Sequence, residues 1–172
     1  EELPQNISVE ATWEMFYQYK LGNSVENVGD YSLSFVGPGE YFKSEAIAAK
    51  KRGIRLIADS QTSGRTWDFG VVPYEPVPQR WMERYQRMLD AREEWGIAGL
   101  LENIHSGFHP SLICELEKQA FFTQVEPLDV TLKKLLERDY GENASAVEQG
   151  MALFSEALSH YVPNNEDMSG GF

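Results

Sequence analysis

Apolar residues recur along this chain with the two periods that distinguish β-strands from α-helices. Short alternating or continuously apolar runs predict strands in residues 7–19 (a strand leading into a polar loop), 31–36, 54–58, 69–74 and 97–101. Apolar residues spaced three or four apart predict helices in residues 44–52, 79–95 and 129–138, and in segments beginning at Ser111 and Asn143. The middle of the chain therefore alternates strand with helix.

Capping and helix-breaking residues support these boundaries. Ser44 and Ser111 are predicted N-caps, and Gly53 and Gly96 are predicted helix stops. The clearest helix, which follows Pro78, has an apolar face made of Trp81, Tyr85, Met88 and Leu89. The last helix carries an apolar stripe made of Val147, Met151, Phe154 and Leu158.

Strand–helix alternation predicts parallel strands joined by right-handed crossovers, so the expected fold class is α/β. A closed (β/α)8 barrel takes about 250 residues, more than the 172 residues of this chain. Half of a barrel and a small open sheet both fit the pattern. We expect a partial β/α barrel in residues 1–126 and helices packed on it in residues 127–172.

Composition and charge restrict the classes of ligand. Hydrophobic residues make up 42% of the chain, which is enough to build a packed core. The 15 Lys and Arg residues against 27 Asp and Glu residues give a net charge of −12, which disfavours binding to nucleic acid or to an anionic membrane. The chain has no glycine-rich loop of the nucleotide-binding kinds, so no such cofactor is expected.

Cysteine content and the pattern of apolar residues bear on the cellular location. A single cysteine, Cys114, excludes an internal disulfide, and no apolar run approaches the ~20 residues of a membrane span. The first residues show no basic-then-apolar signal pattern. We expect a cytoplasmic protein, or one secreted after removal of its signal.

Three loops rich in polar and aromatic groups, residues 59–68, 71–78 and 102–109, carry the candidate chemistry. In parallel α/β folds, functional loops follow the carboxyl ends of strands. Such loops suit a sugar, which offers hydroxyls to polar groups and an apolar C–H face to an aromatic ring. The predicted substrate-binding residues are Trp67, Asp59, Gln61, Tyr74, His105 and His109. Alternatively, Trp67 packs its loop onto the domain.

Carboxylates in the same loops are candidates for acid–base chemistry. Glycoside hydrolysis needs two carboxyl groups, one as acid and one as base or nucleophile. Glu102 directly follows a predicted strand and Asp68 adjoins Trp67, so these two are the predicted catalytic residues. The alternative is that they are ordinary surface or salt-bridged carboxylates.

A metal site at Glu102, His105 and His109 would need their spacing to fall on a helix. Gly107 and Pro110 instead predict a loop, so we expect no bound metal.

Three of the segments resemble a known superfamily. Residues 30–40 (DYSLSFVGPGE), 67–78 (WDFGVVPYEPVP) and 107–111 (GFHPS) resemble the latter part of barrel-type glycoside hydrolases. The similarity is nearest to bacterial proteins that are glycoside hydrolase family twenty-like. Residues 140–142 (YGE) and 153–158 (LFSEAL) resemble the helices that follow the barrel in such proteins.

This resemblance implies a carbohydrate-active protein that forms the C-terminal half of a TIM-type barrel. Two open sheet edges would then favour self-association or pairing with a complementary barrel segment. Family-twenty enzymes carry an adjacent Asp-Glu pair after the fourth strand. Here the only such neighbours are Glu166 and Asp167, in reverse order in the tail, so the principal pair can lie outside this chain. The alternative function is a non-catalytic module that binds a glycan or a partner.

Overall fold

The computed structural model describes residues 4, 6–28, 32–60, 76–102, 111–121 and 126–161. Its centre is a parallel sheet of three strands in the order β1-β4-β5. The strands are β1 (Ser8–Thr12), β4 (Arg55–Ser60) and β5 (Gly99–Glu102). In the register of the sheet, Ala58 of β4 lies between Ala11 and Leu100. The α/β class predicted from the sequence is confirmed.

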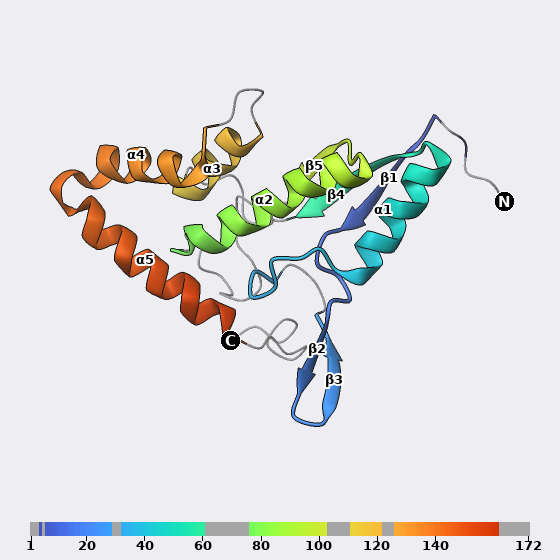
Figure 1. The fold of residues 1–172 in the computed structure, drawn as a ribbon, viewed down its shortest axis with the longest axis horizontal. Coiled ribbons are helices and arrows are strands. Elements are labelled where there is room, and N and C mark those ends of the chain that lie inside the picture. The colour runs from blue at the N-terminus through green and yellow to red at the C-terminus, as the bar shows by residue number, and fades with distance from the viewer. Residues whose placement is uncertain are drawn as a thin grey trace.

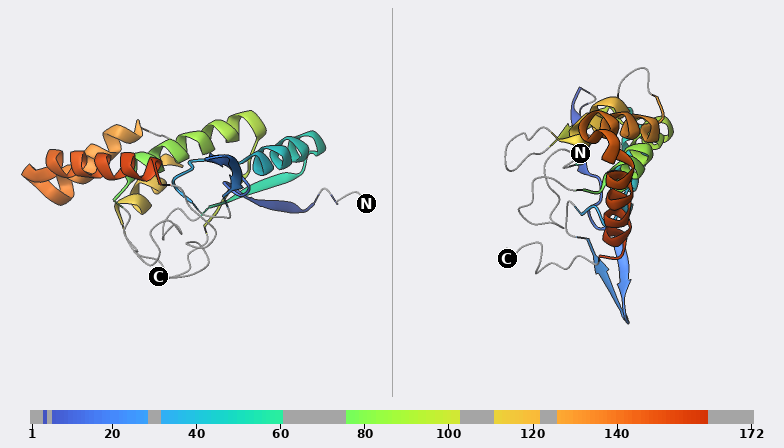
Figure 2. Two further views of the ribbon diagram at one scale, coloured as in Figure 1. Left: turned by 90° about the horizontal axis from the view of Figure 1, so that it is seen from below. Right: turned by 90° about the vertical axis from the view of Figure 1, so that its left-hand side faces the viewer.

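Two crossover helices cover one face of this sheet. Helix α1 (Glu40–Arg52) precedes β4, and α2 (Pro78–Trp95) precedes β5. Both helices lie on the same side of the strands (Figure 2). This one-sided cover follows when right-handed crossovers add each new strand on the same side of the last one.

A hairpin that the sequence did not predict is inserted between β1 and α1. Strands β2 (Gln18–Leu21) and β3 (Ser24–Asn27) pair antiparallel and project away from the sheet (Figure 1). At the base of the hairpin, the ring centroid of Phe35 lies 4.8 Å from that of Tyr17 and 5.2 Å from that of Tyr19.

The remaining helices extend from the β5 side of the sheet (Figure 1). They are α3 (Leu112–Ala120), α4 (Leu128–Tyr140), the short 3-10 helix η2 (Gly141–Asn143) and α5 (Ala144–Ser159). One continuous apolar cluster joins them to the body, from Phe42, Leu56 and Trp81 to Leu132 and Leu158. A hydrogen bond of 2.7 Å between Ser155 and Gln79 also ties α5 to α2.

Several predicted boundaries are confirmed. Gly53 and Gly96 end α1 and α2 with left-handed φ angles of 68° and 73°. Ser111 caps α3, its hydroxyl accepting a hydrogen bond of 3.2 Å from the Cys114 amide. The predicted strands at 54–58 and 97–101 correspond to β4 and β5, while the predicted strand at 69–74 lies outside the described residues.

Two strand predictions are wrong in extent or kind. Residues 32–36 are not a strand, because side chains of α2 and Trp13 bind the carbonyls that a neighbouring strand would otherwise bind. Of residues 7–19, Ser8–Thr12 form β1, residues 13–17 turn, and Gln18 begins the hairpin.

Two helix predictions also need correction. Ser44 is not an N-cap, since α1 already begins at Glu40 and the Ser44 hydroxyl donates to the Tyr41 carbonyl. Phe154 does not belong to the buried stripe of α5, because its side chain is 57% exposed. Ser155 is buried in its place, where α5 packs against α2.

Candidate functional site

The carboxyl ends of all three parallel strands meet at one edge of the sheet. Thr12 aligns with Asp59, and Ser60 aligns with Glu102, the last residue of β5. Residues 61–75 and 103–110 follow β4 and β5 in the chain, so both segments begin at this edge. Parallel α/β folds place their functional groups at such an edge.

Asp59 is a buried carboxylate near the end of the central strand, with only 5% of its surface exposed. Successive strand residues point to opposite faces of a sheet. The Ser60 hydroxyl accepts a hydrogen bond from Arg84 of α2, so Ser60 faces the helices and Asp59 faces the other side. A carboxylate there can bind ligand hydroxyls or act as an acid or base.

A second buried carboxylate, Glu14, follows β1 at the same edge. Its Oε1 lies 3.1 Å from Nη1 of Arg84, and both side chains are completely buried. The Arg84 guanidinium carbon also lies 5.4 Å from the centroid of the Trp81 ring. A buried charge needs a partner and hydrogen bonds to be tolerated, and here the pair links the end of β1 to α2.

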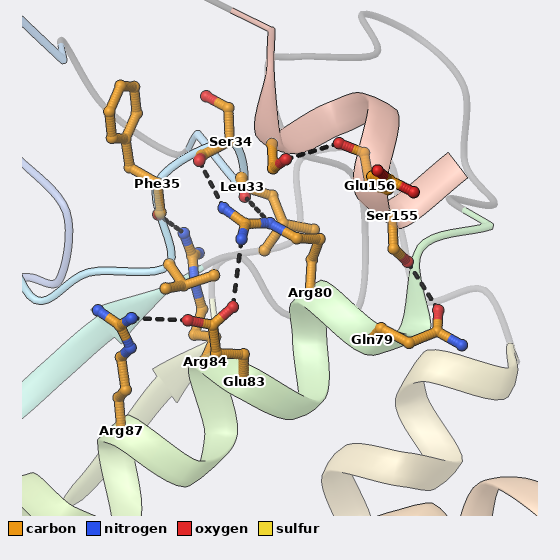
Figure 3. Close-up of polar contacts among 12 residues, drawn as sticks. Leu33, Ser34, Phe35, Gln79, Arg80, Glu83, Arg84, Arg87, Ser155 and Glu156 are labelled. Atoms are coloured by element: carbon orange, nitrogen blue, oxygen red, sulfur yellow. Dashed lines mark hydrogen bonds and ion pairs between the residues drawn. The ribbon is translucent and has the colours of Figure 1, made fainter. Parts of the chain in front are cut away.

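Side chains bind every backbone carbonyl of an irregular segment at this edge, residues 32–37, which we call the clamped segment. The carbonyls of Ser32 and Phe35 accept from Arg84, and those of Leu33 and Ser34 accept from Arg80. Arg87 donates to Gly37 at 2.8 Å, and the Trp13 indole donates to Val36 at 2.8 Å. Figure 3 shows Arg80 and Arg84 of α2 reaching this segment. Six consecutive carbonyls are therefore fixed without a strand partner.

Glycines allow the chain to pass close to the end of β1. A Cβ on Gly37, whose φ is +71°, would lie 2.2 Å from Nε1 of Trp13. A Cβ on Gly39 would lie 2.7 Å from the Met15 carbonyl oxygen. A side chain at either position would clash, so the clamped segment and the start of α1 can lie directly on the turn after β1 only because these residues are glycine.

The structure describes only part of the predicted site. Asp59 lies at the carboxyl edge, and the backbone of Glu102 lies on the adjacent strand, one position beyond the residue aligned with Asp59. The Glu102 side chain lies outside the described part of the structure. The other predicted site residues also lie outside it: Gln61, Trp67, Asp68, Tyr74, His105 and His109.

Sequence reasoning did not find the buried polar residues Glu14, Ser32, Ser34 and Arg84. A signal for Arg84 was present, because it lies three residues after Trp81 and four before Met88, within the apolar face of α2. Three arginines at positions 80, 84 and 87 also follow helical spacing. A charged residue inside an apolar stripe indicates a buried partner.

The described residues contain no group of three or more His, Cys, Asp or Glu side chains placed to hold a metal ion. Among these same residues, every helix is too short or too polar to cross a membrane.

Comparison of the chain with known protein families, with curated proteins and with solved structures gives no match.

Proposed function

We propose that this chain is carbohydrate-active and forms part of a barrel-type glycoside hydrolase that acts on glycosidic bonds. The observation that carries the proposal is the buried Asp59 carboxylate at the carboxyl end of the central parallel strand, on the face that α1 and α2 leave uncovered. The other predicted sugar-binding residues belong to the chain segments that follow β4 and β5, which begin at this same edge.

The topology supports the barrel part of this proposal. Strands β1, β4 and β5 are neighbours in the order in which the chain forms them, and both crossover helices lie on one face. A (β/α)8 barrel repeats this arrangement until the sheet closes. A doubly wound sheet instead reverses its strand order and places helices on both faces.

The chemistry follows from carboxylates on adjacent strands. One carboxylic acid protonates the leaving oxygen of the glycosidic bond, and a second carboxylate attacks the sugar or activates a water molecule. Asp59 supplies a buried carboxylate on the face that α1 and α2 leave uncovered, and Glu102 ends the neighbouring strand, where its backbone aligns with Ser60 rather than with Asp59. In this proposal Glu102 and Asp68 carry the catalytic roles, and Asp59 binds the sugar or assists them.

The experiment is a screen of chromogenic glycosides with the parent chain and an Asp59→Asn variant. We expect Asp59→Asn to lower kcat/KM, because Asp59 binds the sugar or assists the catalytic carboxylates, and a further variant, Glu102→Gln, to lower turnover by on the order of 10²-fold, the usual size of an acid–base contribution. Asp129→Asn, which changes an exposed carboxylate on α4, is the matched control and should leave turnover unchanged. Equal turnover by Asp59→Asn and parent would exclude a role for Asp59.

The same screen distinguishes a glycoside hydrolase from the alternative, a module that binds glycans without hydrolysing them. A chain that binds oligosaccharides but hydrolyses none of the glycosides would be a non-catalytic glycan-binding module. Asp59→Asn should then weaken binding, because the carboxylate accepts hydrogen bonds from sugar hydroxyls.

A further inference from the structure

Two aromatic side chains stand exposed beside the carboxyl edge of the sheet. Phe16, in the turn after β1, is 50% exposed, and Tyr41, in the first turn of α1, is 46% exposed. Their ring centroids lie 5.5 Å apart with an interplanar angle of 77°, an edge-to-face contact. In such a pair each ring packs against the other, and about half of each ring remains exposed to a ligand.

Phe16 occupies a backbone conformation that a bulky residue rarely adopts, with φ at +60°. Hydrogen bonds fix this conformation: the Phe16 amide donates to Val28 and the Tyr17 amide donates to Glu14, each at 3.1 Å. The strain does not serve to bury the ring. Strained residues held by their surroundings gather at functional sites, and here the conformation presents an aromatic ring to solvent.

The path of the chain brings the pair to the candidate site. Phe16 lies two residues after the buried Glu14. The Gly39 amide, just before α1, donates to the Trp13 carbonyl at 2.8 Å and so holds the start of α1 against this turn. The two rings therefore stand on the rim of the edge where Asp59 lies.

Charged side chains of α1 lie close to Tyr41. Glu45, one turn further along α1, raises the pKa of the Tyr41 phenol, chiefly through a hydrogen bond to its hydroxyl. Glu40 and Lys43 form an exposed ion pair of 2.6 Å next to Tyr41 in the chain. Carboxylate and ammonium groups around an open ring match the hydroxyls and apolar C–H face of a sugar.

A protein partner fits this surface less well. Specific protein interfaces bury about 800 Å² on each side, and two half-exposed rings supply only a small part of that. The other exposed large apolar residue of α1, Ile47, is six residues from Tyr41 and so lies on another face of the helix. The size and setting of the pair favour a single sugar ring.

We propose that Phe16 and Tyr41 form a stacking platform that binds one pyranose ring of an oligosaccharide beside the Asp59 edge. This subsite rests on the proposed carbohydrate function. It would hold a sugar unit adjacent to the one at the strand ends and would favour oligosaccharides over short glycosides.

The test uses Phe16→Asn, Tyr41→Ala and, as matched control on the same helix, Ile47→Ala. Binding of the tetrasaccharides of β-1,4-linked glucose and of β-1,4-linked N-acetylglucosamine is measured by calorimetry. We expect the parent to bind one of them and each platform variant to raise its Kd roughly three- to tenfold, the range of an aromatic contact. The control should bind like the parent.

Thermal unfolding distinguishes a binding role from a structural one. Asn tolerates the left-handed conformation, so Phe16→Asn should leave Tm unchanged or raise it by about 2–4 °C. Weaker binding with an undiminished Tm supports the platform. Unchanged binding by the variants would overturn it, whether or not Tm falls. A parent that binds neither tetrasaccharide would overturn it as well.

The outcomes separate this subsite from the proposed function. If Asp59→Asn abolishes hydrolysis while the platform variants bind normally, only the platform is wrong. If the platform variants weaken binding while Asp59→Asn changes neither binding nor turnover, the platform stands and the role of Asp59 is wrong.

Discussion

At the scale of single residues, Arg84 contacts several parts of the structure, although it was not among the functional residues predicted from the sequence. Its guanidinium meets Glu14, Ser60 and the carbonyls of the clamped segment, while its side chain is completely buried. A buried ion pair is weak evidence for net stability, because desolvation offsets much of the attraction. Its clear consequence here is geometric, since the planar group fixes β1, β4 and the clamped segment relative to α2.

We expect Arg84→Met to lower the free energy of unfolding by about 3–5 kcal/mol, because it removes the cation that balances the buried Glu14 carboxylate. Chemical denaturation monitored by tryptophan fluorescence measures this loss. The double variant Glu14→Leu/Arg84→Met should lose less than the sum of the two single variants, since the residues are coupled.

Arg92→Met, at an exposed position of the same helix, is the control and should change stability by less than about 0.5 kcal/mol. Equal losses at Arg84 and Arg92 would contradict the assignment of the buried pair.

At the scale of elements, α2 combines two functions on adjacent faces. Trp81, Tyr85 and Met88 pack in the apolar core, while Arg80 and Arg87 reach carbonyls of the clamped segment. The segment that precedes α1 thus depends on α2 for its conformation, although it lies far from α2 in the sequence.

We expect Arg80→Ala and Arg87→Ala to speed amide hydrogen exchange in residues 32–39 while leaving β4 protected. The reason is that each change removes fixed contacts to the clamped segment and promotes its local opening without exposing the sheet. Hydrogen-exchange mass spectrometry measures both regions in the same sample. Faster exchange across β4 as well would mean that the arginines stabilise the whole fold rather than this segment.

The link between α3 and α4 depends on a charged group at the surface. Arg138 binds Glu115 through two nitrogen–oxygen contacts, of 2.6 and 3.0 Å. These hydrogen bonds hold the pKa of Glu115 below its ordinary value of 4.5. The pKa of Asp139 is lowered by the same guanidinium.

Because both pKa values are lower in the folded state, this stabilisation is present near neutral pH and is lost as pH falls below about 4.5. We expect Arg138→Gln to lower the urea midpoint at pH 7, with the difference from the parent shrinking toward pH 3. The effect should be small, since exposed ion pairs contribute about 0–1 kcal/mol. A difference that is constant with pH would show that Arg138 acts through packing.

Local patterns accounted for most elements but not for the polar contacts between them. The 3.6-residue period placed Trp81, Tyr85 and Met88 on the buried face of α2, and an apolar run ending in Asp59 indicated a strand-end carboxylate. The partners of Arg84 could not be inferred in this way, because Glu14 is 70 residues away and Ser32 is 52 residues away. Residues 32–36 alternate in sequence as a strand does, but their carbonyls bind side chains that are distant in the sequence, which a local pattern does not reveal.

At the scale of the whole molecule, a hollow lies beside each of the two outer strands of the described sheet. One, of about 210 Å³, lies between β1 and α1 and is lined by Val9, Ala48 and Leu56. The other, of about 340 Å³, lies beside β5 and is lined by Met88, Leu100 and Phe121. Within the described part of the chain, β1 and β5 each pair with β4 alone. Edge strands of this kind are templates for pairing with another chain, as expected if further β/α units or a second copy complete the sheet.

We therefore expect the chain to self-associate, or to bind a segment that completes the sheet. We also expect a charge on the exposed part of β5 to weaken this pairing. Leu101, 45% exposed on that strand, is the position to change, because Leu101→Lys places a strongly hydrated group where a neighbouring strand would pack.

Leu153→Lys changes a still more exposed leucine on α5, away from any strand edge, and is the matched control. Light scattering coupled to size-exclusion chromatography should show a concentration-dependent mass that falls for Leu101→Lys and not for the control. A parent chain that stays monomeric at every concentration, with no other polypeptide bound, would show that the edges of this sheet need no partner.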